Sequence, residues 1–375
     1  MNVVPKPHLR GPVPKHDGQD LVFARPFEIL RGAIAEHAFP AASLAVLYRQ
    51  ELVALKAFGQ FTYDSNSPKT KVTTIFDLAS VSKVVATTTM AMILYQRGLL
   101  DLETPVAGIV LEFSGSDSRR TDVTVRMLLA HSSGLPAHDK LYEKAANRED
   151  LLSLAFKVNL AADPGVRAEY SDIGFIILGV LLERIADEPL DRFCQREIFG
   201  ALGMAQTMFH PPIALRPLIP PTVDDRDFRR RVIQGEVQDE NASVLGGIAG
   251  HAGVFSSVAD VAIFMHAMSH AEHSLLRPGT LEVFTRRQPS PRGTLRALGW
   301  DTPSVPSQSG KYFSPRSFGH LGYTGTSLWI DPERHLSIAL LTNRTWPDCT
   351  NQKIKEIRPA FHDAIVEALR LEASI

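Results

Sequence analysis

The spacing of apolar residues predicts a sheet built from both ends of the chain. Residues 41–61 consist of two apolar runs around the polar turn Arg49-Gln50-Glu51, a pattern typical of a β-hairpin. Residues 320–344 predict two further strands, joined by a turn at Asp331-Pro332-Glu333-Arg334. Strands at both ends that flank a helical middle indicate one antiparallel sheet with a helical insertion, and the two ends must meet to complete that sheet.

Helical spacing dominates the rest of the chain. Residues 23–39 have the period of a helix, and residues 174–186 form the clearest buried helix. The region from about 100 to 290 is expected to be mostly helical, with Pro- and Gly-rich loops. A last helix is predicted over residues 354–373, where Pro359 is a candidate point for a kink or a break.

These elements predict an α/β (α+β) fold, in which an antiparallel sheet is flanked by helices and joined to a large helical subdomain. A flexible N-terminal tail is expected over residues 1–20, followed by a single domain over residues 21–375. The sheet subdomain would comprise about 21–75 plus 295–375. The helical subdomain would cover about 80–290.

Composition and charge restrict the class of protein. Hydrophobic residues make up 44% of the chain and charged residues 22%, which is normal for a soluble globular protein. The 40 basic and 41 acidic residues give a net charge of -1. The chain therefore lacks the excess of basic residues that would predict nucleic-acid binding. The sequence contains no run of eighteen apolar residues, so we expect no membrane-spanning segment. The N-terminus has no apolar signal segment, which predicts a cytoplasmic protein. A periplasmic protein whose signal peptide had been removed would have the same sequence pattern.

Cysteine and histidine positions argue against a metal site. Cys194 and Cys349 are the only cysteines, so we expect no disulfide framework and no cysteine metal site, while a single bridge stays open. The spacings of His131, His138 and His251 fit no common zinc site, and we expect no metal and no cofactor. The segment Asp239-Glu240-Asn241 is interpreted either as a solvated loop or as a part of the cleft.

The stretch "SVSK" places Ser80 and Lys83 at the head of an apolar, helix-like run that ends near Gly98. Residues three apart share a helix face, so the two side chains should point the same way. A serine hydroxyl needs a base within hydrogen-bond reach, and a lysine can serve if burial or nearby cations lower its pKa. The N–H groups of a helix start suit an oxyanion. Taken alone, the tetrapeptide is also typical of an ordinary exposed helix start.

Two further segments carry candidate chemistry. "AEYSDIGFIILG" (168–179) places Tyr170 and Asp172 just before the buried helix. In isolation they would be a loop aromatic and a helix cap. Gly319-His320-Leu321-Gly322 begins a late strand, and its glycines would allow a ligand to approach the backbone closely, although in isolation the segment would be a turn.

Together these segments resemble the serine β-lactamase and penicillin-binding-protein superfamily, and within it the class C-like branch that includes esterases with a β-lactamase fold. "ASVSK" matches the S-x-x-K box, "YSD" stands where the family has Y-x-N, and "HLG" stands where it has K-T-G or H-T-G. "VTVRMLLAHSSGLP", "ALGMAQTMF" and "GGIAGHAGVFSSVADVAIFM" are also similar to family segments. The resemblance covers about residues 25 to 370.

The resemblance implies a role for each matching residue. Ser80 would be the nucleophile that forms an acyl-enzyme, and Lys83 would help to deprotonate it. Tyr170 would share the base role and pass the proton to the leaving group. The backbone N–H groups of Ser80 and Tyr323 would form the oxyanion hole, and His320 would line the site opposite the helix.

The second box departs from the family pattern. Asp172 replaces the usual asparagine, and a carboxylate near Lys83 should favour the ammonium form and raise the lysine pKa. This would weaken Lys83 as a base and move that role toward Tyr170, or toward Asp172 as proton acceptor.

The third box departs as well. Leu321, between His320 and Gly322, removes a hydroxyl that relatives use on a substrate carboxylate, and His320 should be mostly neutral at pH 7. Recognition of an anionic substrate is therefore expected to be weakened, unless Arg344 or another arginine supplies the cation. An alternative register would make Tyr323-Thr324-Gly325 the box.

The resemblance implies a serine hydrolase that transfers an acyl group to water without a cofactor. Carboxylesterase activity on short-chain esters is the first expectation, because anion recognition looks depleted. Weak β-lactamase or D,D-peptidase activity on cell-wall-type substrates is the second. A non-catalytic, penicillin-binding-like sensor is the alternative from another class. The expected partner is a small-molecule ester, β-lactam or cell-wall peptide, and the oligomeric state stays open.

Overall fold

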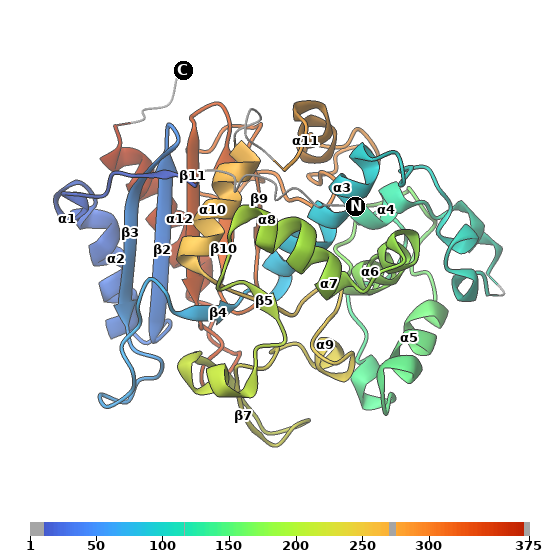
Figure 1. The fold of residues 1–375 in the computed structure, drawn as a ribbon, viewed down its shortest axis with the longest axis horizontal. Helices are drawn as coiled ribbons and strands as arrows, with labels where there is room; N and C mark the ends of the chain where they lie inside the picture. Colours follow the sequence, from blue (N-terminus) through green and yellow to red (C-terminus); the bar gives the residue numbers. More distant parts are fainter. Residues whose placement is uncertain (1–10, 116, 270–274, 371–375) are drawn as a thin grey trace, which may run out of the picture.

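A six-stranded sheet forms one side of the molecule, as seen in a computed structural model that describes residues 11–115, 117–269 and 275–370 (Figure 1). The β2 and β11 strands pair antiparallel, with Leu44 opposite Leu340, which confirms that the two ends of the chain meet in one sheet. In spatial order the strands are β1 (Val13–Pro14), β3 (Glu51–Gly59), β2 (Ala41–Tyr48), β11 (Leu336–Thr342), β10 (Ser327–Asp331) and β9 (Phe318–Leu321).

Helices cover both faces of this sheet. The α2 (Ala24–Ala35) and α12 (Ile354–Ala368) helices contact each other and share a hydrophobic cluster with Leu44 and Val46 of β2. The α10 helix (Val258–Ser269) contacts β2 and β11 from the other side. Successive residues of a strand face opposite ways, so β2 is buried on both faces.

The region between the sheet strands is helical but not exclusively so. A small sheet of β4 (Ile75–Asp77), β8 (Val254–Ser257) and β5 (Met208–Phe209) and a hairpin of β6 (Pro221–Asp225) and β7 (Arg231–Gln234) lie outside the main sheet. The remaining α-helices of this region are α3 (Thr89–Gln96), α4 (Val125–Leu129), α5 (Arg148–Lys157), α6 (Asp172–Ala186), α7 (Leu190–Cys194), α8 (Gly200–Leu202), α9 (Glu240–Val244) and α11 (Pro278–Thr285).

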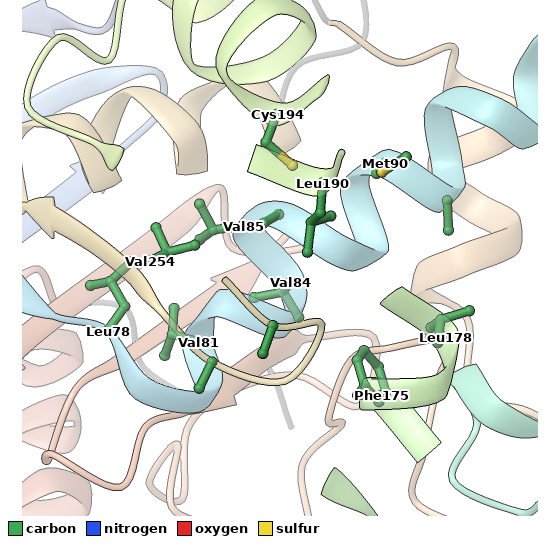
Figure 2. Packing of buried hydrophobic residues seen from close by; sticks show 14 of the residues in the cluster. Leu78, Val81, Val84, Val85, Met90, Phe175, Leu178, Leu190, Cys194 and Val254 are labelled. Carbon is green, nitrogen blue, oxygen red and sulfur yellow. The ribbon is translucent and has the colours of Figure 1, made fainter. Parts of the chain in front are cut away.

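Packing of the segment that begins at Leu78 joins the small sheet to the helices. Figure 2 shows Val84 with Phe175 of α6 on one side and Val254 of β8 on the other. Cys194 is buried in the same cluster, and both cysteines are free thiols, so the single bridge left open by the sequence does not form. No helix in the described part of the chain combines the length and the apolar character needed to cross a membrane.

Three details differ from the sequence expectations. Within residues 1–20, expected to be a flexible tail, Val13–Pro14 form β1, which pairs parallel with β3, and residues 19 and 20 begin the short helix α1 (Gln19–Val22). The "HLG" segment lies at the end of a strand of its own, β9, before the predicted pair β10 and β11. Pro359 lies inside a continuous α12, where the Gln308 side chain donates to the Lys355 carbonyl that Pro359 leaves without a helical donor.

Candidate active site

Ser80 lies in a 3₁₀ turn (Ala79–Val81), and Lys83 begins a π-helical segment (Lys83–Thr88) that leads into α3. The expected single helix is therefore irregular at its start, as is frequent at functional sites. Lys83 Nζ lies 3.0 Å from Ser80 Oγ. Ala79 adopts a left-handed φ of 46°, and its N–H donates to Asp77 Oδ1 at 2.8 Å. This tight turn presents Ser80 to the cavity described below.

Tyr170 reaches the same serine from the loop before α6. Its hydroxyl donates to Ser80 Oγ at 2.8 Å. The loop is held because Ser171 caps α6 through Gly174 N–H, and Ser171 N–H donates to His131 Nδ1 at 3.0 Å. The Tyr170 ring also packs on the His131 ring, 4.7 Å between centroids. The structure thus brings Ser80, Lys83 and Tyr170 together, whereas their catalytic roles stay predictions.

Lys83 is fully buried and makes three polar contacts. Its Nζ lies 3.0 Å from Ser80 Oγ, 2.6 Å from Asp172 Oδ1 and 2.9 Å from the His251 carbonyl oxygen. The expected Asp172–Lys83 contact is present. Burial lowers the pKa of Lys83 from its ordinary value, and the Asp172 carboxylate offsets only part of this effect. The net direction is therefore opposite to the sequence expectation, because desolvation outweighs the attraction between the charges.

Two neighbouring groups are held neutral. Burial, with the Asp172 charge as the second cause, raises the pKa of Tyr170 well above its ordinary value, so the phenol keeps its proton at neutral pH. Burial, followed by the Lys83 charge, lowers the pKa of His320 to about 3. His320 Nδ1 lies 2.8 Å from the Leu321 carbonyl and donates to it, which leaves Nε2 as the acceptor nitrogen.

The glycine of the third box is required by a close contact. A Cβ on Gly322 would lie 1.9 Å from Thr326 Oγ1 and 2.5 Å from the Leu78 carbonyl oxygen. Tyr323 follows and is half exposed at the cavity. The alternative register, Tyr323-Thr324-Gly325, is wrong, because these residues form the turn between β9 and β10, and the buried Thr324 hydroxyl donates to the Asp77 carbonyl instead of facing the cavity.

Ser80 opens into a cavity of about 770 Å³. Asp239 and Glu240 line it, so the interpretation of this segment as part of the cleft is confirmed. Asp239 Oδ1 accepts a hydrogen bond from His251 Nε2 at 2.8 Å. The other lining residues are Ala79, His138, Tyr170, Asp172, Gln238, Ala252, Arg296, Asp301, Gln308, His320, Leu321, Gly322, Tyr323, Arg344, Cys349, Gln352, Ile354, Lys355 and Arg358.

Two arginines of this cavity lack carboxylate partners among the described residues. Arg344 is 5% exposed and donates to the carbonyl oxygens of Tyr323, Cys349 and Asn351. Arg358 is 3% exposed and donates to the Gly325 carbonyl oxygen. Burial, followed by the Arg344 charge, lowers the pKa of Arg358 to about 9. A buried guanidinium without a counter-ion is costly, so these two side chains are suited to receive an anion.

Sequence reasoning missed two arginines of the site and the backbone contact of a loop histidine. His251 acts through its carbonyl oxygen, and a backbone atom leaves no signature in the residue type. Arg296 places its guanidinium 5.5 Å from the Tyr170 ring centroid and pairs with Asp301, but it lies in an irregular loop outside any motif. Arg358 lies on the last predicted helix, where nothing in the spacing marks it as part of the site. Within the described ranges, no three His, Cys, Asp or Glu side chains are grouped to hold a metal ion.

The chain is similar to known proteins over most of its length. Residues 27–358 match the family model named Beta-lactamase. A Salmonella agona protein named "Putative D-alanyl-D-alanine carboxypeptidase" is 30% identical over 355 residues, which covers 84% of this chain and 81% of that protein. An Escherichia coli protein of the same name is 30% identical over 343 residues, or 82% and 79% of the two chains.

Solved structures show the same fold. EstCE1, a hydrolase with promiscuous acyltransferase activity, superposes with a TM-score of 0.76 at 20% identity, covering 92% of this chain and 99% of its own. The octameric penicillin-binding protein homologue from Pyrococcus abyssi has a TM-score of 0.72 at 21% identity, covering 93% of this chain and 77% of its own. At these identities the likeness shows a shared fold alone.

Proposed function

The chain belongs to the beta-lactamase family of serine hydrolases, and we propose that it works through an acyl-enzyme on Ser80. The observation that carries the proposal is that Lys83 Nζ and the Tyr170 hydroxyl both contact Ser80 Oγ, at 3.0 Å and 2.8 Å. A serine hydroxyl becomes an effective nucleophile when a base accepts its proton. The arrangement supports acyl transfer from a substrate carbonyl to Ser80 and then to water.

Lys83 suits the role of proton acceptor when it is neutral. A neutral amine has two N–H donors and one lone pair. Asp172 Oδ1 and the His251 carbonyl would accept the two N–H groups, and the lone pair would then face Ser80 Oγ. Burial supports this form by lowering the lysine pKa. In this proposal Asp172 orients Lys83, since its carboxylate contacts the lysine.

Tyr170 suits the role of proton donor. Its phenol stays protonated at neutral pH and donates to Ser80 Oγ. As Ser80 Oγ bonds to the substrate carbonyl carbon, Lys83 takes the serine proton and the N–H groups of Ser80 and Tyr323 stabilise the oxyanion. Tyr170 then gives its proton to the leaving group and regains one from Lys83. Water repeats these steps on the acyl-enzyme, which releases a carboxylic acid and restores Ser80.

For the substrate, we propose an acyl compound that carries a free carboxylate, as peptide C-termini and penicillins do. The support is the pair Arg344 and Arg358, which line the cavity without carboxylate partners among the described residues. Guanidinium groups bind carboxylates with directed hydrogen bonds. The name of the Salmonella agona relative agrees with a D,D-carboxypeptidase-type reaction.

Hydrolysis of neutral short-chain esters is the second candidate. Leu321 has no hydroxyl, and the neutral His320 offers no positive charge at the box itself. Both features favour an uncharged substrate next to Ser80. EstCE1, which shares the fold, is named a hydrolase with acyltransferase activity.

Covalent labelling tests the proposed chemistry directly. The purified protein would be treated with a fluorophosphonate probe and, separately, with a fluorescent penicillin, and the modified peptide identified by mass spectrometry. We expect the label on Ser80 and not on Ser82, the buried serine two residues away. A label elsewhere, or none from either probe, would contradict the acyl-enzyme proposal. Penicillin labelling without turnover of any ester or peptide would instead favour the non-catalytic sensor.

A further inference from the structure

We propose that Asp77, which has no part in the steps above, is a positioning residue that controls turnover: its ionised carboxylate holds two segments of the active site together, and its backbone carbonyl holds a third. This inference rests on the proposed function of Ser80. Asp77 is the last residue of β4 and is 2% exposed. It is not among the residues that line the cavity, so it would act through its neighbours rather than on the substrate.

The carboxylate of Asp77 joins two segments. Oδ1 accepts the Ala79 N–H at 2.8 Å, and Oδ2 accepts the Gln238 N–H at 2.7 Å. Ala79 has the left-handed φ of 46° that precedes Ser80, a conformation that an alanine adopts only when its surroundings hold it there. An ionised carboxylate accepts hydrogen bonds on both oxygens and has no hydrogen of its own to place.

The backbone of Asp77 joins the third segment. Its carbonyl oxygen accepts the Thr324 hydroxyl at 2.8 Å, and the neighbouring Leu78 carbonyl accepts the Thr326 hydroxyl at 2.8 Å. These bonds dock the turn that carries Tyr323 against the turn that carries Ser80. The two backbone N–H groups predicted to bind the oxyanion are therefore tied to one residue.

Gln238 extends the connection to the lysine. It directly precedes Asp239, whose carboxylate accepts the His251 imidazole N–H at 2.8 Å. The carbonyl of His251 accepts a hydrogen bond from Lys83 at 2.9 Å. Asp77 is thus linked to the nucleophile turn, to the oxyanion turn and, through this chain of contacts, to the lysine.

The charge of Asp77 changes closer to neutral pH than that of an ordinary aspartate. Burial raises its pKa to about 6, although the hydrogen bonds from Gln238 and Ala79 oppose this effect. The charged groups that face it are Asp239, which raises the pKa further, and Arg229, which lowers it. When the carboxyl is protonated, one oxygen becomes a hydroxyl and one N–H donor loses a good acceptor. Turnover should therefore fall as the pH drops through about 6.

The variant Asp77→Asn tests this inference because asparagine has the shape of the protonated acid. Its amide group would turn a donor toward either the Ala79 or the Gln238 N–H. We expect kcat at pH 8 to fall at least about tenfold, with KM changed by less than about threefold. We also expect the step near pH 6 to disappear from the kcat profile, because position 77 has no carboxyl left to titrate.

Asp260→Asn is the matched control. Asp260 is also buried, its pKa is also raised by burial, and it accepts the Gln206 N–H at 2.7 Å and the Thr207 hydroxyl at 2.8 Å. It does not line the cavity. This variant should keep the wild-type kcat and the wild-type acidic limb.

A second measurement does not depend on the folding of a variant. Carbon-13 labelling of aspartate carboxyls in the wild-type protein would be used to follow their chemical shifts against pH. We expect one carboxyl to titrate at the midpoint of the kcat limb. No such carboxyl, or an Asp77→Asn protein that keeps the wild-type limb, would overturn the inference. If Ser80 is not labelled by the probes above, the proposed function fails; if it is labelled but the limb persists, only this inference fails.

Discussion

Lys83 Nζ lies 2.6 Å from Asp172 Oδ1, so the predicted base and a carboxylate form a contact beside the nucleophile although they are 89 residues apart. The lysine side chain is fully buried, and that of Asp172 is 18% exposed. Burial lowers the lysine pKa more than the carboxylate raises it. The pair therefore balances two opposed requirements: a charged lysine needs the carboxylate, and a neutral lysine is needed to accept the serine proton.

Asp172→Asn should destabilise the protein in a pH-dependent way. At pH 7 the variant leaves Lys83 buried without its carboxylate, which should lower the free energy of unfolding by about 3 kcal/mol. A lysine whose pKa is lower in the folded state than in the unfolded state binds fewer protons when folded, so stability rises with pH up to the unfolded pKa of about 10.4. The loss relative to wild type should thus be smaller at pH 9.5 than at pH 7.

Denaturant unfolding of both proteins at the two pH values measures this effect. Because the comparison is made between variant and wild type at each pH, general effects of alkaline pH cancel. An equal loss at pH 7 and pH 9.5 would show that the contact is a hydrogen bond without an ionic component.

Ser80→Ala should abolish turnover while the fold is kept. Loss of a nucleophile removes several orders of magnitude of kcat, which would be measured with p-nitrophenyl butyrate after subtraction of background hydrolysis. Ser82→Ala is the control, since the Ser82 hydroxyl accepts the Val254 N–H at 3.0 Å and does not face the cavity. It should keep kcat within about threefold and lose about 1 kcal/mol of stability. A Ser80→Ala protein with more than about a tenth of wild-type kcat would mean that another nucleophile acts.

Tyr170→Phe should reduce kcat by about a hundredfold or more, with little change in KM. The variant removes the only donor that Tyr170 offers to Ser80 and keeps the ring that packs 4.7 Å from His131. Thermal unfolding should therefore stay close to wild type. Pre-steady-state assays with a p-nitrophenyl ester, whose p-nitrophenolate leaving group needs no proton, should show a smaller defect than assays with an alkyl ester. Equal defects for both leaving groups would argue against proton donation by Tyr170.

Arg358→Gln should change the choice of substrate. The test compares a depsipeptide that ends in D-lactic acid with the same compound carrying a terminal primary amide. If Arg358 and Arg344 bind the carboxylate, the wild-type protein should prefer the acid by at least about tenfold in kcat/KM, equivalent to about 1.4 kcal/mol. Arg358→Gln should reduce this ratio to less than about threefold, chiefly through the KM of the acid.

Lys355→Gln is the control for that experiment, because Lys355 borders the same cavity but is exposed. It should keep the preference for the acid. Wild-type protein that hydrolyses the amide-ended compound as well as the acid would favour the neutral-ester candidate, to which Leu321 and the neutral His320 point.

Local patterns in the sequence determined the features that depend on neighbouring residues. The Ser80–Lys83 pair follows from three-residue spacing at a helix start, and the hairpin of β2 and β3 follows from two apolar runs around a polar turn. The predicted meeting of the two chain ends in one sheet is also confirmed, since β2 and β11 pair antiparallel. It could be predicted because strand patterns at both ends flank a helical middle. Ser80, Lys83 and Tyr170 could be named because their motifs are short and ordered.

Only the tertiary structure decided what depends on segments far apart in the chain. Whether Asp172 raises or lowers the net pKa of Lys83 depends on burial, which a residue pattern does not specify. Arg358 belongs to the cavity because α12 packs behind the β9–β10 turn, and nothing in a helical period marks that residue. Asp77 joins three segments through its carboxylate and one carbonyl oxygen. Such contacts are set by how the elements pack, and backbone atoms, which supply several of them, are the same in every residue type.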